Sequence, residues 1–190
     1  MNPQDLMSDE YRNVLEQYHQ DAKDWGRNAG EKRAPLIHRL VKKYKTKNIL
    51  DYGSGKGSLN EAVQAYKIVS YEPGIPELAN LPKPYDIVVS FGVLEHVEPE
   101  YIDNVLLHIH SLTKVVAYLD IGTLPAKHVL SDGRNAHLIV ENKDWWLEKL
   151  KRAGFNVKSA TPNFNEEGDH SIRLDKQKGK GCIMFVCEPI

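Results

Sequence analysis

A short glycine-rich run is the part of this 190-residue sequence with the clearest chemical meaning. It reads Asp51-Tyr-Gly53-Ser54-Gly55-Lys-Gly57 and lies between a predicted strand, 48–52, and a predicted helix, 59–66. Glycine adopts backbone conformations that other residues avoid, and it lets a ligand approach the chain closely. The unpaired N–H groups at the start of a helix favour a negatively charged ligand group. The run therefore predicts a ligand-binding turn.

An acidic residue follows this turn at a separation that suits a nucleoside. Glu72 stands at the end of the next predicted strand, 67–71, and Pro73 comes directly after it. A carboxylate about 20 residues beyond a glycine-rich turn can accept hydrogen bonds from both hydroxyls of a ribose. A dinucleotide fingerprint, G-x-G-x-x-G, would have its third glycine where this chain has Ser58, so the spacing argues against a nicotinamide cofactor.

Two segments resemble class I S-adenosylmethionine-dependent methyltransferases. The G-x-G-x-G spacing, with Asp51 two positions before the first glycine, is similar to motif I of that family. The segment 85–99, YDIVVSFGVLEHVEP, resembles the family's fourth strand and the turn into its next helix. The resemblance runs from about Leu36 to the C-terminus. It implies that S-adenosylmethionine is the cofactor, and that the cofactor-binding positions are Asp51, Gly53, Gly55, Gly57, Glu72 and Phe91, with Ser54 and Pro73 beside them.

Predicted strands and helices alternate along the chain, which indicates a mostly parallel sheet between two layers of helices. The expected fold class is therefore α/β, a three-layer sandwich with a Rossmann-like sheet. The predicted strands are 48–52, 67–71, 85–90, 115–121, 155–160 and 181–187. The resemblance implies that the last strand is reversed. The family also has a helix, a strand and a further helix where this chain has only residues 74–84, so we expect the third strand to be shortened or missing and the adenine to be more exposed.

The N-terminal part is predicted to be helical. Residues 11, 14, 15 and 18 place apolar side chains on one helix face, a second helix is expected to open near Pro35, and another at Pro99. We divide the chain into 1–34, an N-terminal helical lid or extension, and 35–190, the S-adenosylmethionine-binding methyltransferase domain. Tyr18, Trp25 and Arg27 lie where the family often places a lid, although core packing explains Tyr18 equally well.

A long connection, residues 122–140, follows the fourth predicted strand. Ligands of doubly wound sheets bind beyond the carboxyl ends of the strands, where this connection begins. Its hydrogen-bonding side chains include His128, Asp132, Arg134, Asn135 and His137. We hypothesise that His137 or His96 is a general base for an acceptor with a high pKa, and that Arg134 orients an anionic substrate. The alternative is that Asp132-Gly133 is a turn and that His137 packs under it.

His96 has two interpretations. In a Leu-Glu-His turn a histidine often bonds a backbone group, which favours a structural role over a catalytic one. Glu95, His96 and His137 resemble in part the metal ligands of small-RNA 2′-O-methyltransferases. The paired Glu-x-x-Glu-His spacing of that ligand set is absent, so the sequence predicts no metal.

The net charge of the chain helps to distinguish between classes of methyl acceptor. With 25 Lys and Arg against 26 Asp and Glu, the net charge is −1, and no overall positive field attracts nucleic acid. The expected function is methyl transfer from S-adenosylmethionine to a small-molecule acceptor by in-line displacement. The main alternative is an RNA methyltransferase. Two further alternatives are a nicotinamide-dependent oxidoreductase and a relative that binds the cofactor without catalysis. Local support for RNA comes from two basic clusters, Lys42, Lys43, Lys45 and Lys47, and Arg173, Lys176, Lys178 and Lys180.

Other features concern the compartment. No apolar run approaches about 18 residues, and no apolar segment follows a basic one at the N-terminus, so neither a membrane span nor a secretion signal is expected. Cys182 and Cys187 lie five residues apart in one predicted strand and face opposite sides of the sheet, which disfavours a disulfide. A cytoplasmic protein is predicted. The sequence does not indicate an oligomeric state.

Overall fold

Six strands form one sheet in the computed structural model, which describes residues 2–21, 30–162 and 181–190. The strand order is β2-β1-β3-β4-β6-β5. Strands β2, β1, β3 and β4 run parallel, whereas β6 is antiparallel to both β4 and β5. The predicted mostly parallel sheet with a reversed last strand is therefore confirmed. The strand bounds are β1 Ile49–Tyr52, β2 Val69–Tyr71, β3 Tyr85–Phe91, β4 Thr113–Gly122, β5 Phe155–Pro162 and β6 Cys182–Pro189.

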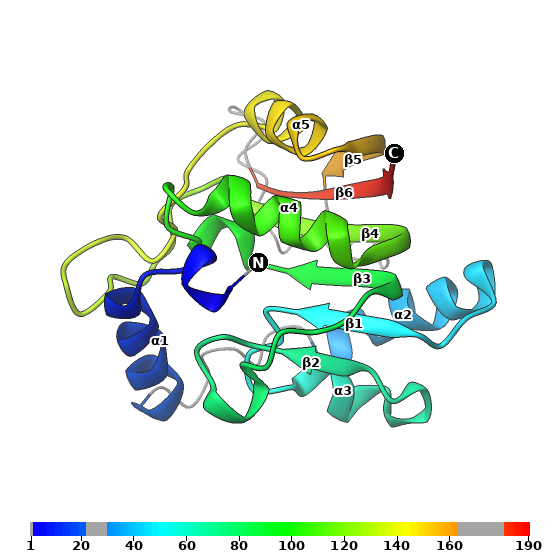
Figure 1. The fold of residues 1–190 in the computed structure, drawn as a ribbon, viewed down its shortest axis with the longest axis horizontal. Helices are drawn as coiled ribbons and strands as arrows, with labels where there is room; N and C mark the ends of the chain where they lie inside the picture. The colour runs from blue at the N-terminus through cyan, green and yellow to red at the C-terminus, as the bar shows by residue number, and fades with distance from the viewer. Residues whose placement is uncertain (1, 22–29, 163–180) are drawn as a thin grey trace.

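Helices cover both faces of the sheet (Figure 1). Helices α4 (Ile102–Leu112) and α5 (Lys143–Arg152) pack on one face, and α2 (Gly30–Tyr44) and α3 (Ser58–Ala62) pack on the other. The sequence of β3 is almost continuously apolar because the strand contributes to the apolar cores on both faces of the sheet. Val88 packs in the core under α4 and α5, and Ile87 and Val89 pack in the core under α2 and α3. A strand that is covered on both faces buries side chains on both sides of the sheet. The predicted three-layer sandwich is confirmed.

Local residues cap both ends of helix α5. The Asn142 side chain accepts hydrogen bonds from the backbone N–H groups of Asp144 and Trp145, at 2.9 and 3.0 Å. These bonds satisfy two N–H groups that the first turn leaves unpaired, and they begin the helix. Gly154, with φ of 92°, follows its last turn in the left-handed conformation that glycine adopts at low cost.

Two other predicted helix starts are wrong. Helix α2 begins at Gly30, and Pro35 lies inside it, because a proline near the start of a helix removes only one hydrogen bond and α2 still buries its apolar face. Helix α4 begins at Ile102 and not at Pro99, since the Tyr101 N–H donates to the Glu98 carbonyl in a turn that precedes the helix. The helix predicted over 59–66 ends at Ala62, and a 3-10 turn, η2 (Gln64–Tyr66), follows it.

Strand β2 forms one edge of the sheet. Residues 72–84, all of them described, connect β2 to β3 through one 3-10 turn, η3 (Pro76–Leu78), and contain no strand. Prolines 76, 82 and 84 cannot donate backbone hydrogen bonds, which disfavours a paired strand in this segment. The expected loss of a third strand is confirmed.

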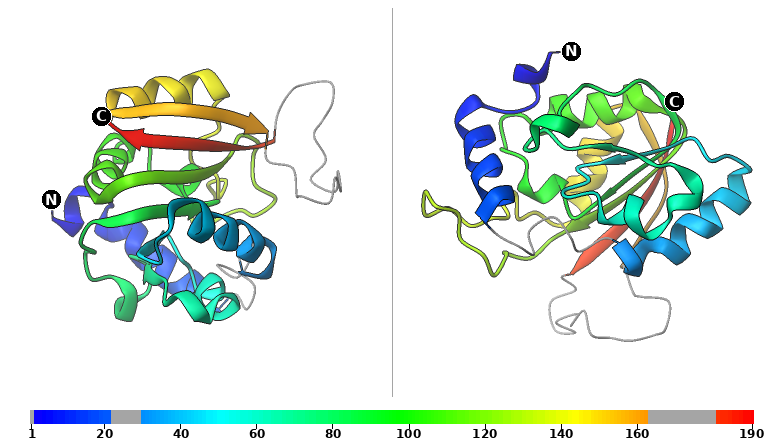
Figure 2. Two further views of the ribbon diagram at one scale, coloured as in Figure 1. Left: turned by 90° about the vertical axis from the view of Figure 1, so that its right-hand side faces the viewer. Right: turned by 90° about the horizontal axis from the view of Figure 1, so that it is seen from below.

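The N-terminal segment consists of a 3-10 turn, η1 (Pro3–Asp5), and helix α1 (Asp9–Asp21). Helix α1 lies beyond the carboxyl ends of β1 and β3, beside the connection that follows β4 (Figure 2). An apolar cluster joins the two: Met7, Tyr11, Leu15, Leu130 and Ala136. We call η1, α1 and the residues between them the N-terminal cap. The division of the chain at residue 34 stays a prediction, and Trp25 and Arg27 lie outside the described residues.

Two further observations concern the described part of the chain. None of its helices combines the length and the apolar character needed to cross a lipid bilayer. Cys182 is half-buried and Cys187 is buried, and both are free thiols.

Candidate active site

The glycine-rich turn connects β1 to α3. Gly53, Gly55 and Gly57 have φ angles of 75°, 52° and 77°, in the left-handed region that favours glycine. A Cβ on Gly53 would lie 2.4 Å from Cγ1 of Val93, so no side chain fits there. Helix α3 has only five residues, so its dipole adds little to binding. The N–H groups of Gly53 and Ser54 donate to the Tyr71 carbonyl, and that of Gly57 donates to the Ser54 carbonyl. The turn therefore offers a ligand close approach to the backbone.

Glu72 connects this turn to the segment after β2. Its carboxylate accepts hydrogen bonds from the N–H groups of Gly55, at 3.0 Å, and Gly74, at 3.1 Å. Its Oε1 also lies 3.8 Å from Nε2 of His19 in α1. Each carboxylate oxygen has more than one lone pair, so ligand hydroxyls can still donate to Glu72.

Asp51 is buried directly before the turn. Its carboxyl oxygen Oδ2 has no hydrogen-bond partner among the described residues. Burial, and then the nearby charge of Glu72, raise the pKa of Asp51 to about 7. A cationic ligand group beside Asp51 and Glu72 would offset both effects by favouring the ionised carboxylate.

A cavity of about 290 Å³ lies between this turn, the carboxyl ends of the central strands and the N-terminal cap. It is close to the lower limit, roughly 300 Å³, of cavities that bind small molecules. Helix α1 contributes Tyr11, Leu15 and His19 to its wall, and Met7 lies just before the helix. Asp51 and Gly57 lie outside the lining. Six of the eight predicted cofactor-binding residues line the cavity: Gly53, Ser54, Gly55, Glu72, Pro73 and Phe91.

Among the lining residues that the sequence did not predict is a pair of opposite charges. Arg33 of α2 forms an ion pair with Asp120, which is buried near the end of β4. The Arg33 guanidinium also lies 5.1 Å from the centre of the Phe91 ring. The sequence could have indicated Asp120 as a site residue, because it is an acidic residue within an apolar strand. It gave no such indication for Arg33, which precedes the predicted helix start.

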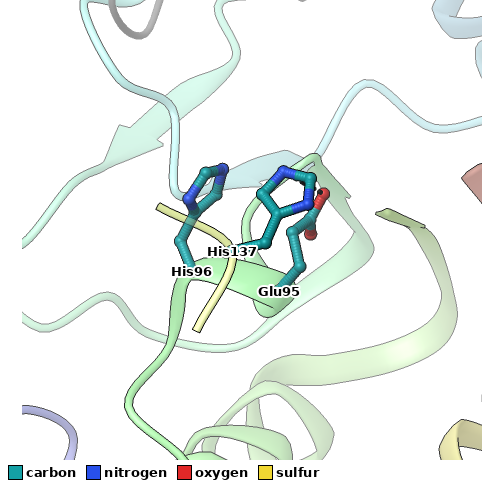
Figure 3. A group of neighbouring side chains, drawn as sticks. All are labelled: Glu95, His96 and His137. Carbon is teal, nitrogen blue, oxygen red and sulfur yellow. Dashed lines mark ion pairs between the residues drawn. The ribbon is translucent and has the colours of Figure 1, made fainter. Parts of the chain in front are cut away.

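Glu95, His96 and His137 meet beyond the carboxyl ends of β3 and β4 (Figure 3). Glu95 and His96 belong to a 3-10 turn, η4 (Leu94–His96), and His137 belongs to the connection after β4. One oxygen or nitrogen from each side chain lies within 4.8 Å of the other two. Glu95 Oε1 lies 4.0 Å from His137 Nε2 and accepts a hydrogen bond from the Gly122 N–H at 2.8 Å. The structure thus brings both predicted histidines together with a buried carboxyl group.

Backbone groups orient both imidazoles. His96 Nδ1 donates to the Ala136 carbonyl at 2.7 Å, and His137 Nδ1 donates to the Leu124 carbonyl. Because a carbonyl oxygen only accepts, Nδ1 carries the proton and Nε2 carries the lone pair in each neutral ring. Burial lowers the pKa of both histidines and raises the pKa of Glu95 to about 7. His96 lines the cavity, whereas His137 lies behind it.

Arg134 lies on the outer side of the connection. Its Nε donates to Asp132 at 2.8 Å, and its guanidinium is 5.6 Å from the centre of the Tyr11 ring, which lines the cavity. The Gly133 N–H donates to the Leu130 carbonyl at 2.9 Å, so the turn expected at 132–133 is confirmed. Arg134 therefore stands at the rim of the cavity and not inside it.

The sequence matches the family model described as "Methyltransferase domain" over residues 25–162, well over half of the chain. The chain belongs to this methyltransferase family. It is a class I S-adenosylmethionine-dependent methyltransferase, as the sequence resemblance predicted. No curated protein matches it in sequence.

Solved structures of other methyltransferases are similar in fold to this chain. The 1,6-didemethyltoxoflavin-N1-methyltransferase of Burkholderia thailandensis, with bound 1,6-didemethyltoxoflavin and S-adenosylhomocysteine, has a TM-score of 0.64 and 16% identity, over 95% of this chain and 89% of that chain. The magnesium protoporphyrin IX methyltransferase of Synechocystis, with bound S-adenosylhomocysteine, has a TM-score of 0.61 and 13% identity, over 94% and 99%. A TehB-like methyltransferase of Corynebacterium glutamicum has a TM-score of 0.57 and 15% identity, over 95% and 97%. At these identities the similarity concerns the fold.

Proposed function

We propose that this methyltransferase transfers the methyl group of S-adenosylmethionine to a small-molecule acceptor held beside His96. The position of the cavity carries the proposal. One wall is the glycine-rich turn with Glu72, another wall includes His96, and Tyr11 and Leu15 of the N-terminal cap cover it. A cavity covered by a helix suits a small molecule that can be enclosed, and it does not suit a polymer chain.

The residues present fit the cofactor. The left-handed glycines of the turn let a ligand lie close to the backbone, and the unpartnered Oδ2 of Asp51, buried directly before the turn, favours a cationic ligand. When bound, S-adenosylmethionine supplies a methyl group on a sulfonium, which makes the sulfur a good leaving group. Glu72 would accept hydrogen bonds from the ribose hydroxyls, Phe91 would contribute its ring to the binding surface, and Asp51 would stabilise the positive charge.

The acceptor is placed by the side chains on the other side of the cavity. The imidazole of His96 lies beside its nucleophilic group, in an orientation that the bond from Nδ1 to the Ala136 carbonyl fixes. His137 supports this position from behind, and Arg134 at the rim attracts an anionic acceptor. Holding nucleophile and methyl carbon in line supplies most of the rate enhancement, on the order of 7–11 kcal/mol.

The basic clusters give little support to a nucleic-acid acceptor. Lys42, Lys43, Lys45 and Lys47 lie between the last turn of α2 and the start of β1, at the amino end of the parallel strands. The cavity lies at the opposite, carboxyl end of these strands. The second cluster lies outside the described residues: Arg173, Lys176, Lys178 and Lys180.

A methyl-transfer screen tests the proposal. The purified protein is incubated with isotopically labelled S-adenosylmethionine and with hydroxyl-, amine- and carboxylate-bearing small molecules or RNA, and label transfer is measured. We expect label in small anionic acceptors and a higher KM in Arg134→Ala. Arg152→Ala is the matched control, because Arg152 is exposed on α5 and forms an ion pair with Glu148. Label in RNA, with a steep salt dependence, would contradict the proposal.

A further inference from the structure

We infer that Glu95, His96 and His137 form a binding site for one divalent transition-metal ion, and that this ion holds the acceptor of the methyl group. Ion binding stands on the geometry of the three side chains alone. The role in holding the acceptor rests on the proposed function. The sequence predicted no metal because a second glutamate is missing from the Glu-x-x-Glu-His pattern. Three protein ligands are enough when the remaining coordination positions are left for a substrate.

Both histidines are held in the way that metal-binding histidines are held. A histidine ligand almost always donates its other ring N–H to a carbonyl or carboxylate, which fixes the ring and its tautomer. His96 donates from Nδ1 to the Ala136 carbonyl at 2.7 Å, and His137 donates from Nδ1 to the Leu124 carbonyl. In this tautomer the lone pair of each ring is on Nε2. The ring centres lie 4.8 Å apart, side by side (Figure 3).

Glu95 supplies the third ligand. This residue is 2% exposed, Oε1 accepts the Gly122 N–H, and the buried Oε2 has no hydrogen-bond partner among the described residues. A buried carboxyl oxygen without a partner is costly, and a cation bound to the Glu95 carboxylate would offset part of this cost. The site also depends on Gly122, where a Cβ would lie 2.6 Å from Glu95 Oε1 and 2.9 Å from His137 Cε1.

The three ligand atoms need to move only slightly closer together to bind one ion. The three ligand atoms lie within 4.8 Å of one another. Ligands about 2.0–2.2 Å from a transition metal are at most about 4.4 Å apart, so side-chain rotations that move these atoms by about 1 Å are enough. Of the three ligands, His96 lines the cavity, so an acceptor in the cavity would reach the ion from the His96 side.

The ligand set indicates the class of ion. Imidazole nitrogen suits Zn²⁺, Co²⁺ and Fe²⁺, whereas Mg²⁺ and Ca²⁺ prefer oxygen ligands. Two histidines and one carboxylate form a set that leaves positions open for substrate. An acceptor that carries a hydroxyl or carboxylate oxygen would bind at these positions. The ion would then polarise a hydroxyl, which loses its proton to water, and would replace an imidazole base in that step.

Direct metal binding tests the first part of this inference. The metal-free full-length protein is titrated with Co²⁺, and visible absorption and calorimetry report the stoichiometry and the affinity. We expect one ion per chain. Glu95→Gln, His96→Asn and His137→Asn should each weaken binding by at least about 10-fold, the loss that removal of even an outer partner of a ligand causes. His38→Gln is the control, because His38 is exposed on α2, away from the cluster. Thermal unfolding identifies any variant that does not fold, and Glu95→Asp then takes the place of Glu95→Gln.

Several outcomes would overturn the inference. Absence of stoichiometric Co²⁺ binding to the wild-type protein, or equal binding by the three variants, would refute the ion site. Chelator treatment should abolish methylation of an oxygen-bearing acceptor, and Zn²⁺ or Co²⁺ should restore it. Equal activity of the metal-free protein would refute the role in holding the acceptor. Failure of S-adenosylmethionine to bind the metal-free protein, with Co²⁺ binding intact, would refute the proposed function and leave the ion site in place.

Discussion

Replacement of Asp51 by asparagine should stabilise the ligand-free protein and weaken cofactor binding, both in a pH-dependent way. Asp51 is buried near Glu72, and these two causes raise its pKa from 3.8 to about 7. The folded protein therefore keeps a proton on Asp51 that the unfolded chain releases. Asparagine has nearly the same shape and carries no charge at any pH.

The sign and the size of the stability change follow from the pKa values of Asp51 in the unfolded chain and in the folded protein. Between about pH 4 and pH 7 the folded state binds more protons than the unfolded state, so the free energy of unfolding falls as the pH rises through this window and is level above it. Each pH unit within the window corresponds to about 1.4 kcal/mol. From pH 5 to pH 8 the wild-type protein thus loses about 3 kcal/mol that Asp51→Asn keeps. For a chain of this size that difference is roughly 6–12 °C in Tm.

Thermal unfolding at pH 5, 6, 7 and 8 without ligand measures this effect. The Tm difference between Asp51→Asn and wild type should widen up to pH 7 and then stay constant. Asp103→Asn is the control, because Asp103 is exposed on α4 and pairs with Lys149. In parallel, the affinity of the wild type for S-adenosylmethionine should rise towards pH 7 as Asp51 ionises, and the variant should bind weakly at every pH. Parallel Tm curves for wild type and Asp51→Asn would refute the reasoning.

Two further variants probe the walls of the cavity. Glu72→Ala should leave the circular dichroism spectrum unchanged and weaken S-adenosylmethionine binding in calorimetry by about 10-fold or more, because bonds to a charged group contribute about 1.5–3 kcal/mol each; unchanged affinity would contradict the ribose assignment. Arg33→Met should destabilise the protein by about 3 kcal/mol in urea unfolding, since it removes the cation that forms an ion pair with the buried Asp120 carboxylate. The double variant with Asp120→Asn should regain most of that loss, and additive losses would show that the two residues do not act as a pair.

Local sequence signals were enough to predict the sheet and the cofactor side of the site. The glycine-rich turn follows β1, and Glu72 follows β2. The carboxyl ends of two parallel strands lie next to each other whenever the strands pair, so these residues must meet. The gap between Pro73 and Tyr85 is too short for another paired strand, so the shortened sheet could also be predicted. These features depend on residues that are close in sequence or on strands that must be neighbours.

The acceptor side could not be predicted in the same way. An amphipathic pattern shows that α1 has an apolar face, but it does not show that Tyr11 and Leu15 pack over the cavity. Arg33 meets Asp120 only because α2 begins five residues before Pro35. The meeting of His137 with Glu95 depends on the path of the long connection after β4, which hydrogen bonds within that connection set.

Calorimetric titration of the purified wild-type protein with S-adenosylmethionine, S-adenosylhomocysteine and NAD tests most directly whether the glycine-rich turn and Glu72 hold an adenosyl sulfonium. We predict that S-adenosylmethionine and S-adenosylhomocysteine each bind once per chain and that NAD does not bind. Binding of NAD in preference to both, or no binding of any of the three, would contradict the account.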